Sequence, residues 1–118
     1  MDRIITGAHT IIESTDPDAD RAFFRDVLAF DSVDAGNGWL IFALPPAELA
    51  IHPGQSGRHR LYLMCADLET SLHRLKSRGA QVDSRIEEQS WGRLASMTLP
   101  GGGELGIYEP SHPTPPHP

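Results

Sequence analysis

The sequence contains a single cysteine, Cys65, so it cannot form an internal disulfide, and a reducing cytoplasmic location is the expectation. Long apolar runs are also missing, since the longest, Trp39 to Pro46, is far too short to cross a bilayer. The first residues lack a basic stretch followed by an apolar one, so no signal peptide is expected. These absences predict a soluble protein without a membrane partner.

A concentration of positive charge is missing as well. The chain of 118 residues has 10 Lys and Arg against 16 Asp and Glu, which gives a net charge of −6, and its basic residues are scattered. Nucleic-acid-binding proteins normally present a basic patch to phosphates, so nucleic acid is not an expected partner. The length suits one domain, because two independent cores of half this size would each be marginal.

The first half of the chain begins with a strand and a helix. Residues 4–12 are rich in Ile and Thr and predict a strand. Asp16 and Pro17 predict a helix start, because Asp caps free N–H groups and Pro fits the first helical position. Further short strands are expected over residues 31–35, 39–44 and 49–52, and a Gly36-Asn37-Gly38 turn joins the first two of them.

The second half repeats this order. Residues 58–66 predict a strand, Asp67 caps a second helix, and three more strands are expected over 81–86, 93–99 and 104–109. His9 precedes Asp16 by seven positions, and His59 precedes Asp67 by eight. The sequence therefore predicts one α+β domain over residues 1–110, with two βαβββ modules at about 3–54 and 58–110. A disordered proline-rich tail is expected over 111–118.

With these motifs the sequence resembles the vicinal oxygen chelate superfamily, which includes glyoxalase I, bleomycin resistance proteins and extradiol dioxygenases. The resemblance covers nearly all of the chain except the tail. It implies an open, barrel-like mixed sheet built from the two modules, a homodimer, and a small-molecule ligand. The matching stretches are His9, Asp16 and residues 23–30 in the first half, and His59, 67–69, 91–92, 99–102 and 108–110 in the second.

The resemblance also implies a divalent metal such as Zn, Fe, Ni or Mn, which would act as a Lewis acid on two neighbouring substrate oxygens. His9 and His59 occupy the places of the family's first-strand ligands. The last-strand glutamate of the family falls on Gly106, and Glu104, about 7 Å earlier along the strand, is the candidate replacement. The alternative is that both histidines are hydrogen-bonded pocket residues and that no metal is bound.

Other side chains are candidates for lining a ligand pocket. Four aromatic residues can supply flat surfaces for a planar ligand, although core packing is the alternative role for each: Trp39, Tyr62, Trp91 and Tyr108. Glu13 shares the expected strand face of His9 and can act as a base there, or it is a solvated strand-end residue. Glu48 and His52 lie near the place of the other expected carboxylate, and neither matches it cleanly.

Two functions follow from this pattern. The first is a metal-dependent lyase, isomerase or dioxygenase that acts on a small oxygenated substrate. The alternative is a metal-free protein of bleomycin-resistance type that binds or sequesters a small molecule such as an antibiotic. The histidine pair favours the first, and Gly106 in place of the family carboxylate favours the second.

Overall fold

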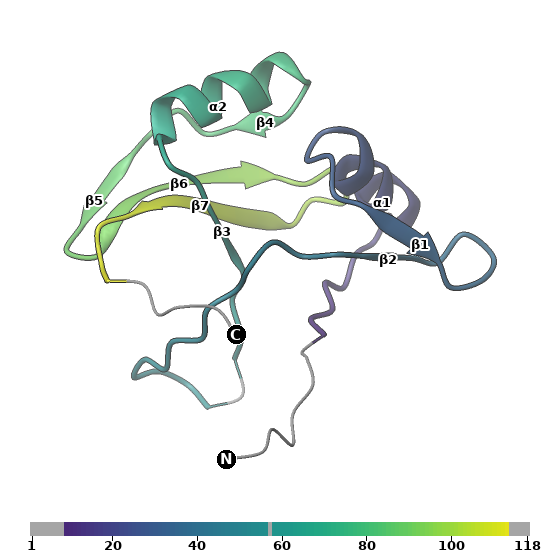
Figure 1. Ribbon diagram of the computed structural model, residues 1–118, viewed down its shortest axis with the longest axis horizontal. Coiled ribbons are helices and arrows are strands. Elements are labelled where there is room, and N and C mark those ends of the chain that lie inside the picture. The colour runs from purple at the N-terminus through teal and green to yellow at the C-terminus, as the bar shows by residue number, and fades with distance from the viewer. Residues whose placement is uncertain (1–8, 57, 114–118) are drawn as a thin grey trace.

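The computed structural model describes residues 9–56 and 58–113. Its elements follow the order α1 (Pro17–Asp26), β1 (Ser32–Asp34), β2 (Leu40–Phe42), β3 (Tyr62–Met64), α2 (Leu68–Ser77), β4 (Gln81–Val82), β5 (Glu87–Gln89), β6 (Gly92–Thr98) and β7 (Glu104–Pro110). The expected α+β class and the open, unclosed sheet are confirmed (Figure 1). No helix in these two ranges is long and apolar enough to cross a membrane.

The described strands form a two-stranded and a five-stranded sheet. The larger has the order β3-β7-β6-β4, and β5 pairs with β6 beyond this path. β3 runs parallel to β7, whereas the pairs that β6 makes with β4, β5 and β7 are antiparallel. β1 and β2 form a separate hairpin that projects from the rest of the molecule (Figure 1). The β3–β7 pair therefore joins the start of the second half to its end.

The local signals for helix starts and for the hairpin turn are confirmed. The side chains of Asp16 and Asp67 cap the two helices, since they accept the N–H groups of Ala19 and Thr70 at 3.3 and 3.1 Å. The turn at residues 36–38 has positive φ at all three positions, which explains its composition of two glycines and an asparagine.

Several expected strands differ from the structure. Residues 4–8 of the first strand lie outside the described ranges, and residues 9–13 are not in a strand. Residues 49–52 form no strand, because none of the described strands pairs with them. The strand expected over 58–66 is reduced to β3, and β5 was not expected because Glu87–Gln89 carries no apolar alternation. Of the predicted tail, residues 114–118 lie outside the described ranges, and the Ser111 N–H donates to the Trp91 carbonyl at 2.9 Å.

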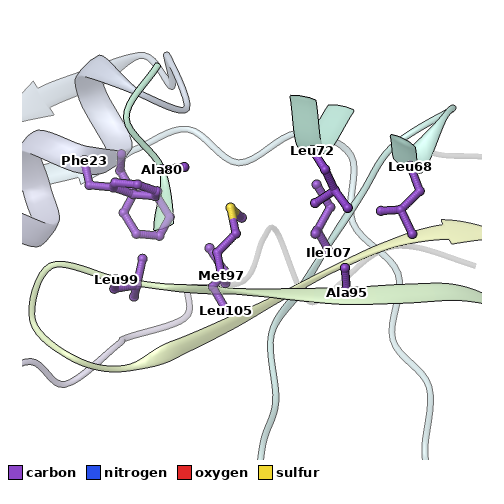
Figure 2. Packing of buried hydrophobic residues seen from close by; sticks show 10 residues of the cluster. Phe23, Leu68, Leu72, Ala80, Ala95, Met97, Leu99, Leu105 and Ile107 are labelled. Atoms are coloured by element: carbon purple, nitrogen blue, oxygen red, sulfur yellow. The ribbon is translucent and has the colours of Figure 1, made fainter. Parts of the chain in front are cut away.

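The hydrophobic core lies between one face of the five-stranded sheet and the two helices (Figure 2). Its most buried side chains are those of Leu68, Met97 and Leu105, with 0%, 1% and 2% of their surface exposed. Because side chains alternate along a strand, Leu105 and Ile107 face this core while Gly106 and Tyr108 face the other way. We call the side of the sheet away from the helices the open face.

A large apolar surface remains exposed around the β1–β2 hairpin and the segment that follows it. Its most exposed members are Val33, Trp39, Leu49 and Ile51, at 67%, 66%, 88% and 89%. The accessible surface is 9176 Å², whereas a folded monomer of this mass typically exposes about 6,300 Å². The radius of gyration is 15.4 Å, compared with about 13.5 Å for a compact chain of this length. The exposed side chains between Val33 and Ile51 therefore leave an apolar surface of the first half uncovered.

Candidate functional site

Three aromatic side chains meet on the open face, and we call Tyr62, Trp91 and Tyr108 the aromatic cluster. Their ring centroids lie 6.3 Å (Tyr62–Trp91), 6.0 Å (Tyr62–Tyr108) and 5.1 Å (Trp91–Tyr108) apart, in edge-to-face arrangements. Such pairs stabilise each other beyond their buried area. All three are partly buried, so the cluster keeps apolar surface in contact with solvent.

The Tyr62 ring lies directly against Gly106, its neighbour across the parallel β3–β7 pair. A Cβ atom at position 106 would lie 2.5 Å from Tyr62 Cε1, and closer still to Cδ1. No real side chain tolerates such a contact without displacing the ring. Tyr62 therefore occupies the place where the family resemblance expects a carboxylate, and this arrangement does not fit a metal ligand at position 106.

A polar group borders the aromatic cluster at Tyr108. The Tyr108 hydroxyl lies 3.1 Å from His112 Nε2, and His112 Nδ1 lies 2.8 Å from the Pro113 carbonyl oxygen. Because a carbonyl oxygen only accepts, Nδ1 donates to Pro113, and when that is the only ring proton, Nε2 accepts the Tyr108 hydroxyl. Glu48 Oε1 lies 3.9 Å from Nε2. Burial raises the pKa of Tyr108, and the negative charge of Glu48 raises it further.

The other expected pocket residues lie outside this cluster. Trp39 lies at the β1–β2 turn, where the Arg21 guanidinium carbon is 5.0 Å from its ring centroid. Glu13 and His52 are exposed. Three of the four aromatic candidates therefore lie in contact on the open face, and Trp39 lies apart from them.

The structure does not bring the three candidate metal ligands together. His9, His59 and Glu104 are all exposed. Within residues 9–56 and 58–113, no group of three or more His, Cys, Asp or Glu side chains lies close enough to hold a metal ion. These described residues therefore do not assemble the ligand set that the resemblance implies, and metal binding stays a prediction for solution experiments.

The strand pattern around His59 explains part of this result. Over the strand expected at residues 58–66, simple alternation would put His59 on the same face as Leu61, Leu63 and Cys65. These three side chains pack against the helix-side core, whereas Tyr62 lies on the open face. In addition, β3 begins only at Tyr62, so strand alternation does not extend back to His59. The apolar face of β3 is thus the core face and not the pocket face.

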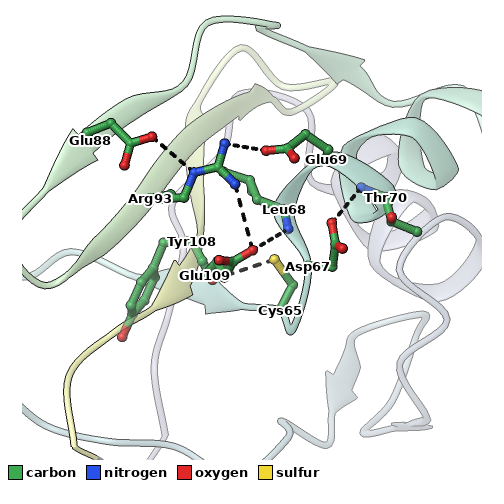
Figure 3. Close-up of polar contacts among 9 residues, drawn as sticks. All are labelled: Cys65, Asp67, Leu68, Glu69, Thr70, Glu88, Arg93, Tyr108 and Glu109. Atoms are coloured by element: carbon green, nitrogen blue, oxygen red, sulfur yellow. Dashed lines mark hydrogen bonds and ion pairs between the residues drawn. The ribbon is translucent and has the colours of Figure 1, made fainter.

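An ion-pair network on the core side of β6 and β7 holds the strand that carries Tyr108 (Figure 3). The Arg93 guanidinium contacts Glu69 at the start of α2, Glu88 at 3.1 Å and Glu109 at 3.9 Å. Glu109 also accepts the Leu68 N–H at 3.0 Å. Hydrogen bonds to Glu69 and Glu88 raise the pKa of Arg93. The network connects the N-terminus of α2 to β5, β6 and β7. It therefore fixes, from the core side of the sheet, the strand that carries Tyr108.

Cys65 lies beside this network and is a poor nucleophile. Burial raises the pKa of its thiol, and the carboxylates of Glu109 and Asp67 raise it further, although a hydrogen bond with Ser71 opposes them. Its Sγ lies 3.6 Å from the Tyr108 carbonyl oxygen. The protonated thiol is therefore a packing group.

Sequence reasoning missed the polar border of the site. His112 was assigned to the disordered tail, and Glu48 was noted only for its position near the end of the first half. The Tyr62–Gly106 contact had a usable signal, because an aromatic residue often covers a glycine on the neighbouring strand. That signal depends on the parallel register of β3 and β7, which the sequence does not state.

Neither a protein-family model nor a curated protein matches the sequence. Solved structures do match. The antibiotic-binding protein TnmS3 from a Streptomyces species has a TM-score of 0.68 and 24% identity, over 93% of this chain and all of that one. A glyoxalase/bleomycin resistance protein/dioxygenase superfamily member from Sphaerobacter thermophilus has a TM-score of 0.61 and 21% identity, over 91% and 99% of the two chains. The chain has the fold of this superfamily.

The fold is shared by proteins with different activities. A lactoylglutathione lyase from Agrobacterium tumefaciens matches with a TM-score of 0.59 and 17% identity, over 91% of this chain and 96% of that one. The resemblance inferred from the sequence is thus confirmed at the level of the fold. Because one fold hosts an enzyme and a binding protein, the function has to be argued from the site.

Proposed function

We propose that this protein binds a planar small molecule against the aromatic cluster, without a metal at that site, and sequesters it rather than converting it. The observation that carries the proposal is the Tyr62 ring lying on Gly106. It replaces a metal-ligand position with an apolar, flat surface. The antibiotic-binding protein of the same fold indicates the kind of ligand.

The chemistry of the cluster supports binding over catalysis. Partly buried tyrosine and tryptophan rings offer large, rigid apolar surfaces at a small entropic cost. The pKa of Tyr108 is raised, so its hydroxyl stays protonated and donates to His112 instead of acting as a base. The Cys65 thiol packs on the core side of the sheet, where its Sγ contacts the Tyr108 carbonyl oxygen, so it does not face the aromatic cluster. The aromatic cluster therefore presents a recognition surface.

The proposal is tested with acridone and proflavine, two planar three-ring probes, by quenching of Trp91 fluorescence. The Trp39→Phe background leaves Trp91 as the only emitting tryptophan and should itself leave binding unchanged, because Trp39 lies at the hairpin turn. We expect metal-free protein to bind, and Tyr62→Ala to weaken binding by about tenfold through the lost ring contact. Binding that requires added zinc, nickel, manganese or ferrous iron, and that survives Tyr62→Ala, would instead support the metal-dependent reading.

We also propose that two copies of the chain associate through the exposed apolar surface of the β1–β2 hairpin. Val33 and Ile41 are directly paired across the hairpin and are 67% and 44% exposed. Apolar surface of this extent on a soluble protein usually marks an interface.

Sedimentation at micromolar concentration should therefore give twice the 12.9 kDa chain mass. The double variant Val33→Lys with Ile41→Lys should weaken self-association by about tenfold or more, because two charges would be desolvated. The control is Gln81→Lys with Thr98→Lys, a pair that is also exposed and directly paired across antiparallel strands. A wild-type monomer, or equal effects of both double variants, would contradict this interface.

A further inference from the structure

One oxygen atom of Glu48, at the polar border of the aromatic cluster, lacks a partner among the described residues. Glu48 Oε2 is buried from solvent and forms no hydrogen bond with the described residues. Only 15% of the Glu48 side-chain surface is exposed. An unpaired carboxylate oxygen loses its hydration without compensation, and native proteins rarely keep such an atom unless a ligand, ion or water completes it.

The hydrogen-bonded groups nearest to the Glu48 carboxylate direct their protons elsewhere when the His112 ring is neutral. An ionised carboxylate is only an acceptor. The Tyr108 hydroxyl proton is directed at His112 Nε2, and the His112 Nδ1 proton is directed at the Pro113 carbonyl. A molecule that enters here must therefore supply the donor itself. A ligand whose nearest group is an oxygen anion would meet the Glu48 charge without a counterpart.

The aromatic rings favour positive charge for a separate reason. The faces of tyrosine and tryptophan rings carry negative electrostatic potential and attract cations. The chain already uses one of them in this way, since the Arg60 guanidinium carbon lies 5.8 Å from the Tyr62 ring centroid. The net charge of −6 adds a long-range attraction for cations.

We infer that the ligand is a planar cation, with a protonated nitrogen that pairs with the Glu48 carboxylate while its ring system lies against Trp91 and Tyr108. The inference rests on the proposed function and specifies its ligand class, an aromatic molecule with an amino or amidinium group. Glu48 is then the residue that selects charge, and the aromatic cluster is the surface that selects shape.

The test compares proflavine, a cation at neutral pH, with acridone, its neutral three-ring counterpart. Glu48→Gln removes the charge and keeps the side-chain size. Glu104→Gln is the matched control, because it changes the net charge equally from an exposed position at the start of β7. We expect Glu48→Gln to raise the Kd for proflavine about tenfold, as for loss of a charge-assisted hydrogen bond. The Kd of Glu48→Gln for acridone should change by less than about twofold, and so should the Kd of Glu104→Gln for either probe.

The outcomes separate the inference from the proposed function. If wild-type protein binds both probes equally and Glu48→Gln changes neither, the charge inference is wrong while the binding function stands. If neither probe binds wild-type protein, both the proposed function and the inference are wrong.

A second variant with a thermal readout keeps the inference testable if Glu48→Gln does not fold. Glu48→Met removes the unpaired carboxylate, so the ligand-free variant should melt higher than wild type by about 3 °C or more. Proflavine should then raise the melting temperature of wild-type protein more than that of the variant, because the variant binds it more weakly. A variant that melts lower than wild type would show that Glu48 is satisfied within the folded chain and would overturn the inference.

Discussion

Gly106→Glu should destabilise the protein instead of restoring a metal site. The new side chain would collide with the Tyr62 ring, which already lies within contact distance of the Gly106 backbone. Tyr62 would have to leave the aromatic cluster, and overpacking of this kind costs about 3 kcal/mol. Urea unfolding followed by circular dichroism would measure the loss, and zinc titration of the folded variant should show no uptake.

Two further variants make the interpretation specific. Gly106→Glu combined with Tyr62→Ala should recover most of the stability, because the space of the ring becomes available to the carboxylate. Gly54→Glu is the control for the substitution itself, since an added Cβ there meets nothing within 4 Å; it should stay within about 0.5 kcal/mol of wild type. A fully stable Gly106→Glu protein that takes up zinc would mean that Tyr62 moves freely, and would favour a metal-dependent function.

Asp20→Ala should be the most damaging single truncation of a charged side chain. Asp20 is 8% exposed, and its Oδ1 accepts the Gly101 N–H at 2.7 Å. The Gly101 carbonyl accepts the Thr15 hydroxyl at 3.0 Å. These bonds fasten the start of α1 to the turn between β6 and β7. Loss of the carboxylate leaves a partly buried N–H without a partner, which costs about 2 kcal/mol.

The control for this prediction lies in the same helix. Asp18 is exposed and pairs with Arg21 at 3.1 Å, and Asp18→Ala should change stability by less than about 0.5 kcal/mol. Chemical unfolding of both variants decides between a specific bond and a general effect of acidic residues near the helix start. Equal and small losses for Asp18→Ala and Asp20→Ala would contradict the role assigned to Asp20.

Features with a local physical cause were predictable from the sequence. Both helix starts follow from a single capping aspartate, and the hairpin turn follows from three neighbouring residues that tolerate positive φ. The β5 strand was not predictable in this way, since Glu87–Gln89 is a strand only because its backbone pairs with β6. The strand predicted over 49–52 is absent for the opposite reason. Its residues are apolar, but no strand of the described chain lies beside them to pair with.

The candidate site was predictable as a set of side chains but not as an arrangement. Tyr62, Trp91 and Tyr108 were expected in a pocket and lie in contact. The sequence could not separate them from Trp39, since composition does not say which aromatic residues meet. The sequence also could not show that the Glu48 side chain is buried, or that one of its oxygens lacks a partner among the described residues.

The parallel pairing of β3 with β7 has a consequence for the order in which the molecule is built. Cys65 and Tyr108, which bond across this pair, are 43 residues apart in the chain. Closing so long a loop costs entropy that local contacts do not repay, so such pairings form late in folding. The aromatic cluster depends on this pairing, since Tyr62 comes from β3 and Tyr108 from β7. The proposed binding surface is therefore completed at the end of folding, and a nascent chain that has not yet added β7 lacks the Tyr62–Tyr108 contact.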